Sequence, residues 1–282
     1  GTGFTPLNWN SQRIMSFIDT CDKKMNEFQG FVSQVQKASL QIQEVVCAIE
    51  STVLVQHADI YDMNTGKEVG TQRAPQKGGP MEVTEFYEMM ESRRTERVEA
   101  LVSKYKSVES LLRKVEEVVA GTNGGDSPVL EGYHHYWEKC IYNAITRMVV
   151  VSMATLLSVL QDKGSQPFMQ VKVALNGKDF VVSPPASELF KNMRKFVKNI
   201  IESSKVFVRW MHGTCLECKP VAVNADEEPY VFNYYETDIV NNPNVVKLNI
   251  TLNFALSDAL KKLEKYVDGW KRYDQGQGLW DA

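Results

Sequence analysis

The residues best suited to chemistry in this sequence are His212, Cys215 and Cys218, which follow the end of a predicted helix. Two thiolates at Cys-x-x-Cys spacing can bind one tetrahedral metal ion, and structural zinc sites use sulfur and imidazole ligands. Such a site needs a fourth ligand, and the other histidines do not lie at ligand spacing from a cysteine. We therefore predict no metal and interpret this segment as a loop with free thiols. A zinc-stabilised binding module stays open as an alternative.

Two glycine-rich segments, residues 66–70 and 121–126, invite comparison with a phosphate-binding loop. That loop needs a lysine and then a serine or threonine after its last glycine, between a strand and a helix. Neither segment meets this requirement. We predict neither a nucleotide site nor any other cofactor in this chain.

Signs of hydrolytic catalysis are few. The chain has four histidines, and it lacks the Gly-x-Ser-x-Gly pattern of a nucleophile elbow. His134 and His135 stand among Tyr133, Tyr136 and Trp137 in a predicted helix, where a packing surface is the simpler interpretation. We predict no catalytic residue and no enzymatic activity for this segment.

Composition narrows the class of protein further. The hydrophobic content of 43% is sufficient for a core. The net charge of -3 and the isoelectric point of about 5.9 argue against nucleic-acid binding and against an anionic membrane surface. The most apolar stretch, Met148 to Leu160, is interrupted by serine and threonine, so we expect a buried helix rather than a membrane span. The five cysteines are an odd number, which favours reduced thiols. The first residue is not Met, so we expect a fragment of a longer protein.

The first predicted element is a helix of unusual length. From Ile14 to Val53, apolar residues alternate spacings of four and three, which places them on one stripe of a helix spanning roughly 60 Å. The stripe can pack within this chain or pair with a helix of another subunit, and both remain open. Candidate interaction residues, including aromatic ones from a later helix, are Phe28, Val32, Val35, Ile42, Tyr133, Tyr136 and Trp137.

Helical spacing also dominates the rest of the chain. A Gly/Pro-rich loop at about residues 63–80 precedes a helix over residues 83–120, and another helix runs from residue 128 to 163. We expect the outer face of the 83–120 helix, which carries Glu91, Arg93, Arg94, Glu96, Lys104 and Lys106, to be solvated.

One short region breaks the helical period. An Asn176-Gly177 pair between alternating runs predicts a β-hairpin over residues 168–182. A fourth helix follows it and is expected to run through Met211 to Gly213. A short helix near Tyr234 is possible in the loop that comes next. Residues 246–254 fit either a strand or a helix, and we favour the helix because its stripe continues to Trp270.

The predicted fold class is therefore mainly α, with long antiparallel helices in elongated bundles and one small β-hairpin. We expect two parts: a long two-helix bundle over residues 1–125, and a helical bundle with the hairpin over residues 126–282.

Several motifs, taken in their order along the chain, resemble axonemal dynein heavy chains in the segment just before their linker. The resemblance covers most of the chain and is carried by residues 85–117, Tyr133-His134-His135-Tyr136-Trp137-Glu138, Val182-Ser183-Pro184-Pro185, residues 207–215, residues 266–273, and Leu279-Trp280.

In that family the tail of helical bundles precedes a linker and a ring of AAA+ modules that hydrolyses ATP. The resemblance implies a non-catalytic tail segment that scaffolds an ATP-driven, minus-end-directed microtubule motor and positions its ring in cilia or flagella, after a cytoplasmic stage. The implied partners are intermediate chains, light chains and neighbouring heavy chains, without direct microtubule contact by this segment. An unrelated coiled-coil adaptor, which would form homo-oligomers through the first helix, is the main alternative.

Overall fold

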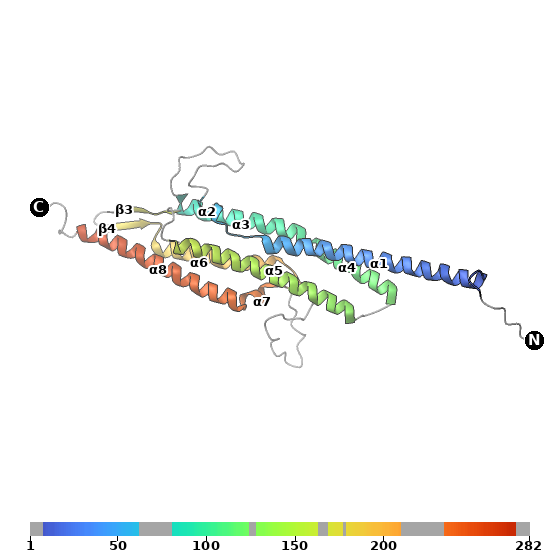
Figure 1. Cartoon of the computed structure of the whole chain (residues 1–282). Helices are drawn as coiled ribbons and strands as arrows, with labels where there is room; N and C mark the ends of the chain where they lie inside the picture. The colour runs from blue at the N-terminus through green and yellow to red at the C-terminus, as the bar shows by residue number, and fades with distance from the viewer. Residues whose placement is uncertain are drawn as a thin grey trace, which may run out of the picture.

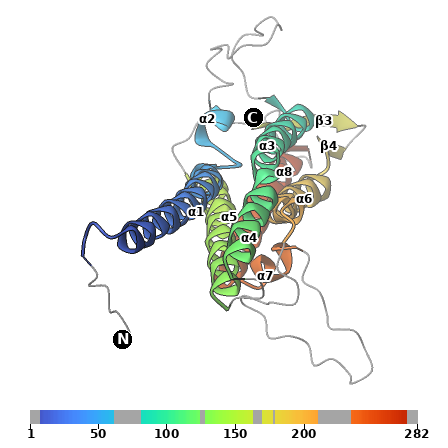
Figure 2. The same cartoon turned by 90° about the vertical axis from the view of Figure 1, so that its right-hand side faces the viewer.

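The computed structural model describes residues 8–61, 81–123, 128–162, 169–176, 179–209 and 234–274. Long helices lie side by side along one direction and form an elongated body, with the first helix projecting beyond its neighbours (Figures 1 and 2). The mainly helical fold expected from the sequence is confirmed. The helices are α1 Gln12–Ser51, α2 His57–Tyr61, α3 Val83–Tyr105, α4 Ser107–Asn123, α5 Pro128–Gln161, α6 Ala186–Glu202, α7 Glu236–Val240 and α8 Pro243–Asp274.

Helix α5 is at the centre of the body and contacts α1, α4, α6 and α8. Ser39 bonds Tyr133 near the start of α5, whereas Glu50 pairs with Arg147 further along it, so α1 and α5 run in the same direction. Helices α3 and α4 return in the opposite direction (Figure 1). The expectation of antiparallel packing thus holds between α1 and α3–α4 and fails between α1 and α5.

The apolar character of α5 has a structural explanation. By length and composition alone, α5 is the one described helix that could cross a membrane. Its residues Ile141, Ile145, Met148 and Val149 are fully buried against the other helices. The stretch from Met148 to Leu160 is therefore the buried helix that we expected from the sequence.

The helix expected over residues 83–120 is divided in two, which corrects the prediction. Helix α3 ends at Tyr105 and α4 begins at Ser107. The Ser107 hydroxyl donates to the Lys104 carbonyl at 2.7 Å, a local bond that competes with the helical ladder and often bends helices. The apolar stripe continues across the break, since Tyr105, Val108 and Leu112 are all buried.

The hairpin is present, with a register that differs slightly from the prediction. Strand β3 (Lys172–Asn176) pairs antiparallel with β4 (Asp179–Ser183), and Asn176 lies opposite Asp179 rather than in the turn. A second, unpredicted sheet joins β1 (Met81–Glu82) to β2 (Met169–Gln170) in parallel. These two-residue strands carry no sequence pattern, because only the packing of distant segments brings them together.

The fourth predicted helix is shorter than expected. Helix α6 ends at Glu202, and a 3-10 turn over Ser203–Val206 leads into an extended Phe207. The hydroxyls of Ser203 and Ser204 donate to the carbonyls of Asn199 and Ile201 in the last turn of the helix. Helix α8 settles the choice at residues 246–254 in favour of a helix, and α7 lies near the expected short helix. The Gly/Pro-rich loop lies outside the described residues.

Buried apolar residues from α1 to α8 form one core cluster. This cluster includes residues from both sides of the proposed division at residue 125. The division into two parts stays a prediction.

Candidate interaction surface

Helix α1 divides into two halves with different surroundings. Beyond residue 35, its apolar side packs on α4 and α5, and Ile42 and Ile49 are fully buried. Before residue 35 no described residue of α1 is buried, and Phe28 and Met25 are 62% and 59% exposed. We call residues 12–34 of α1 the arm, and the rest of the described chain the body.

An apolar stripe at helical spacing runs along the arm and ends at the first residue of the body. We call it the exposed stripe: Ile14, Ile18, Cys21, Met25, Phe28, Val32 and Val35. Its central members are exposed, whereas Ile14 and Val35 at its two ends are half-buried. Contiguous apolar surface of this kind is unusual on a monomeric protein and marks interaction sites. Only the first half of α1 therefore presents the exposed apolar surface that an interface requires.

The seven candidate interaction residues fall into two groups. Phe28, Val32 and Tyr136 are exposed, and Val35 and Tyr133 are half-buried. Ile42 and Trp137 are instead buried in the core of the body, so we no longer count them as surface candidates. The reason is that α4 and α5 cover α1 where Ile42 lies, and Trp137 faces the core from α5.

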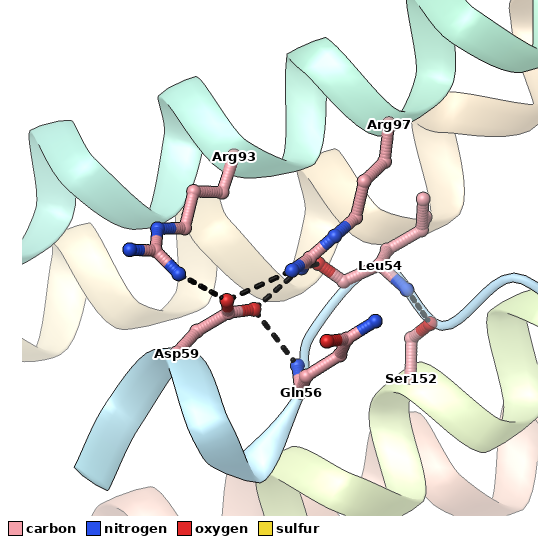
Figure 3. Close-up of polar contacts among 6 residues, drawn as sticks. All are labelled: Leu54, Gln56, Asp59, Arg93, Arg97 and Ser152. Carbon is pink, nitrogen blue, oxygen red and sulfur yellow. Dashed lines mark hydrogen bonds and ion pairs between the residues drawn. The ribbon is translucent and has the colours of Figure 1, made fainter. Parts of the chain in front are cut away.

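A charged cluster joins α2 to α3 (Figure 3). Asp59 of α2 is 2% exposed and accepts bonds from Arg93 at 2.5 Å and from Arg97 at 2.5 and 2.8 Å. Arg97 also donates to the Leu54 carbonyl at 2.9 Å, and the Leu54 amide donates to Ser152 of α5 at 2.8 Å. One carboxylate and two arginines therefore join α2 and α3 at the point where α1 ends.

The electrostatics of Asp59 follow from this geometry. Burial by itself disfavours the ionised carboxylate, but the hydrogen bonds from Arg97 and Arg93 outweigh it, so the pKa of Asp59 is lowered. Arg93, which we expected to be solvated on the outer face of its helix, keeps 38% of its side chain exposed, but its guanidinium pairs with the buried Asp59. Glu91 and Arg94 are also half-buried, and they bond Asn199 and Ser203 at the end of α6.

A second charged cluster lies wholly inside the body. Arg209 donates to Glu138 of α5 at 2.6 Å and to Asp238 of α7 at 3.2 Å, and all three side chains are fully buried. Burial disfavours the charged guanidinium, but the bond to Glu138 outweighs it and raises the pKa of Arg209. A buried pair of this kind is weak evidence for net stability, yet removing one member is strongly destabilising.

The sequence did not lead us to predict either of these two charged clusters. One signal was available: Arg97 occupies a position in the inner apolar stripe of its helix, where a charge requires a partner. The partner could not be identified, because Asp59 is 38 residues away in the chain. Glu138 and Arg209 both occur within motifs that we had noted only for their resemblance.

The described residues contain no group of three or more His, Cys, Asp or Glu side chains placed to hold a metal ion. The weak metal candidates His212, Cys215 and Cys218 lie outside the described residues, so that prediction stays untested. The charged clusters above are saturated with internal bonds, which is typical of structural contacts rather than of groups that await a substrate.

The chain is similar to two known proteins over nearly its whole length. No family model matches the sequence. The chain is 40% identical over 286 aligned residues to the Dynein-1-alpha heavy chain of the flagellar inner arm I1 complex from Chlamydomonas reinhardtii, covering 99% of this chain. It is 31% identical over 272 residues to the Dynein axonemal heavy chain 10 from Homo sapiens, covering 96% of this chain.

The chain spans about 6% of the length of each of these two relatives. The similarity is therefore to one segment of each relative. Its extent agrees with the resemblance noted from the motifs, and in both cases the relatives are axonemal or flagellar heavy chains. Along nearly its whole length, this chain is related to one segment of the axonemal dynein heavy chains.

Proposed function

We propose that this chain is a non-catalytic structural segment of a dynein heavy-chain tail, which helps to position an ATP-driven motor ring in a cilium or flagellum. The observation that carries the proposal is the match over 99% of the chain to one small segment of a flagellar dynein heavy chain. The proposed position, in the tail just before the linker, rests on the motif order described above.

The architecture suits a mechanical part. Helices of 32 to 40 residues (α8, α5 and α1) lie along the length of the molecule and share one densely packed core. Packed protein interiors resist compression and transmit strain. The clusters around Asp59 and Arg209 join separate helices at fixed points, so they hold the relative placement of α2, α3, α5 and α7.

The proposed partners are dynein intermediate chains, light chains and neighbouring heavy chains in the axoneme, with assembly preceded by a cytoplasmic stage. The arm supplies apolar surface for such contacts. We propose no nucleotide, cofactor, nucleic-acid, membrane or microtubule binding by this segment.

A deletion in the full heavy chain tests the proposal. A heavy chain lacking this segment should retain ATP hydrolysis by its purified motor region but should fail to build its arm, as counted by electron tomography of axonemes. A heavy chain that carries Arg113→Met within the segment is the matched control, because Arg113 forms only an exposed pair with Glu109. Normal arms after deletion, or ATP turnover above background by the isolated segment, would contradict the proposal.

A zinc-stabilised binding module remains the second candidate, carried by the spacing of His212, Cys215 and Cys218. Metal analysis of the purified chain decides it. One zinc per chain, lost when both cysteines are replaced by serine, would favour this candidate.

A further inference from the structure

Helix α6 has two sides of opposite character. Its buried side packs into the body through Leu189, Met193, Phe196, Val197, Ile200 and Ile201. Its outer side carries four exposed cations, which we call the basic bank: Lys191, Arg194, Lys195 and Lys198. No acidic residue occurs between Leu189 and Ile201, so these four charges lie together on one side of two helical turns.

Helix α3 presents the opposite charge beside α6. The two helices are neighbours (Figure 2) and run in the same direction, since Tyr87 bonds the Leu189 carbonyl and Glu91, further along α3, accepts a bond from Asn199. The first turns of α3 carry two exposed carboxylates at three-residue spacing, Glu85 and Glu88, which we call the acidic bank. Charges of opposite sign therefore flank one seam of the body.

A hollow of about 330 Å³ lies between the two banks, with Glu88 lining it from α3 and Lys195 lining it from α6. Within the described parts of the chain, Lys198 is the one member of either bank that forms an ion pair, with Glu202 at 3.3 Å. The two banks thus face each other without joining, unlike the carboxylate of Asp59, which its arginines saturate. Both signs of charge remain available to a partner that enters the groove.

We infer that this groove binds a helix of another protein, which has acidic side chains along one flank and basic side chains along the other. The acidic flank pairs with the basic bank, and the basic flank pairs with the acidic bank. Both banks have the three- and four-residue spacing at which side chains line up on a helix, so a helical partner laid along the groove can meet both rows of charges. A second hollow of about 370 Å³, which shares Asn199 with the first, extends the groove toward the end of α6. The inference goes beyond the proposed function and does not depend on it.

The acidic bank decides against a polyanion as the occupant. Nucleic acid or an anionic membrane would meet Glu85 and Glu88 beside the four cations, and like charges brought together weaken binding. The net charge of -3 on the whole chain also disfavours a partner of uniformly negative charge. A partner that carries both signs is attracted on each side of the groove, and partners with one sign are repelled on one side, which provides specificity.

A synthetic peptide tests the inference on the whole chain. The probe is a fluorescently labelled, alanine-based helix with glutamates along one flank and lysines along the other, and fluorescence anisotropy measures its binding. We expect modest affinity that falls as salt is added, because exposed ion pairs are individually weak and are screened. Lys191→Glu combined with Lys195→Glu should raise the dissociation constant at least about tenfold, because both substitutions repel the acidic flank.

Lys261→Glu combined with Lys265→Glu on α8 is the matched control. It reverses two exposed charges at the same four-residue spacing and gives the chain the same net charge. Because these charges lie outside the groove, the dissociation constant should change by less than about twofold. Equal helical content by circular dichroism shows that both double variants are folded.

A charge swap in the probe separates direct pairing from a loss of structure. A peptide with lysines on both flanks should bind the Lys191→Glu, Lys195→Glu variant more tightly than it binds the matched control. Absence of probe binding at low salt, equal weakening by the two double variants, or failure of the charge swap would overturn the inference. Equally tight binding of a peptide with glutamates on both flanks, of duplex DNA or of phosphatidylserine vesicles would also overturn it, since the groove would then recognise negative charge alone.

Discussion

The two halves of α1 have the same apolar period but opposite environments. Phe28 in the arm is 62% exposed, whereas Ile42 in the body is fully buried, although both belong to one stripe on one helix. The difference arises because α4 and α5 pack against the second half of α1, where its buried residues begin at Ala38 and where Ser39 bonds Tyr133 near the start of α5. The comparison shows that periodicity selects which face of a helix is apolar, while the lengths of its neighbours decide how much of that face is covered.

Charged residues follow the same division. The body encloses Arg209, Glu138 and Asp238 completely, and it holds Asp59 between two arginines. In the arm, by contrast, Lys24 and Glu27 form an exposed pair, which contributes little to stability. Substitutions in the body and in the arm should therefore have effects of very different size.

The largest expected effect comes from Arg209→Met, which removes the cation from between two buried carboxylates. We expect a loss of about 3–5 kcal/mol in the free energy of unfolding. Urea denaturation followed by circular dichroism measures this loss. Arg113→Met, at an exposed pair in α4, is the control and should change stability by no more than about 0.5 kcal/mol. Similar effects at the two sites would show that the Arg209 cluster is not enclosed.

One substitution made in both regions tests the comparison directly. Phe207 is fully buried and packs edge-to-face on Tyr105 with ring centroids 5.2 Å apart. Phe207→Ala should therefore lower the free energy of unfolding by about 3–5 kcal/mol. Phe28→Ala, measured at concentrations where the chain is monomeric, should change it by less than about 0.5 kcal/mol. A large loss for Phe28→Ala in the monomer would mean that the arm packs within its own chain.

Asp59→Asn should have an intermediate and pH-dependent effect. The variant keeps the shape but removes the charge that Arg93 and Arg97 share, so we expect a loss of about 1–3 kcal/mol at pH 7. The pKa of Asp59 is lowered in the folded state, so its contribution is present above its unfolded pKa of about 4 and disappears as the pH falls through the folded pKa.

Urea midpoints of the wild type and of Asp59→Asn should therefore converge below about pH 4. Asp258→Asn, at an exposed pair with Lys262, is the control and should differ little from the wild type at any pH. A constant gap between the wild type and Asp59→Asn down to acid pH would exclude this electrostatic origin.

The smallest expected effect is stabilisation of the arm by Gly30→Ala. A Cβ at Gly30 meets no atom within 4 Å, and alanine is favoured over glycine in a helix by about 1 kcal/mol. Amide hydrogen exchange of residues 14–32 should slow by about fivefold, while exchange in the body stays unchanged. A parallel slowing in α5 would indicate that the arm and the body unfold as one unit.

Much of the fold could be predicted, because it depends on neighbours in sequence. The spacing of Ile14 to Val53 predicted α1, and the stripe from Leu248 to Trp270 favoured α8 over a strand. The Asn176-Gly177 pair predicted the hairpin to within one residue of its register. The break at Lys106 was missed, because the apolar stripe passes through it and the bond of the Ser107 hydroxyl to the Lys104 carbonyl leaves no periodic signal.

The candidate interaction surface was harder to predict from the sequence than the fold. Phe28 and Val32 could be proposed as surface residues, but Ile42 shares their pattern and is buried. The sequence by itself determined the helices, their apolar faces and the relationship to dynein heavy chains, because these depend on local spacing and on residue identity. Only the tertiary structure decided which part of the α1 stripe is covered and which charges are paired, because both depend on segments that are distant in the chain and adjacent in space.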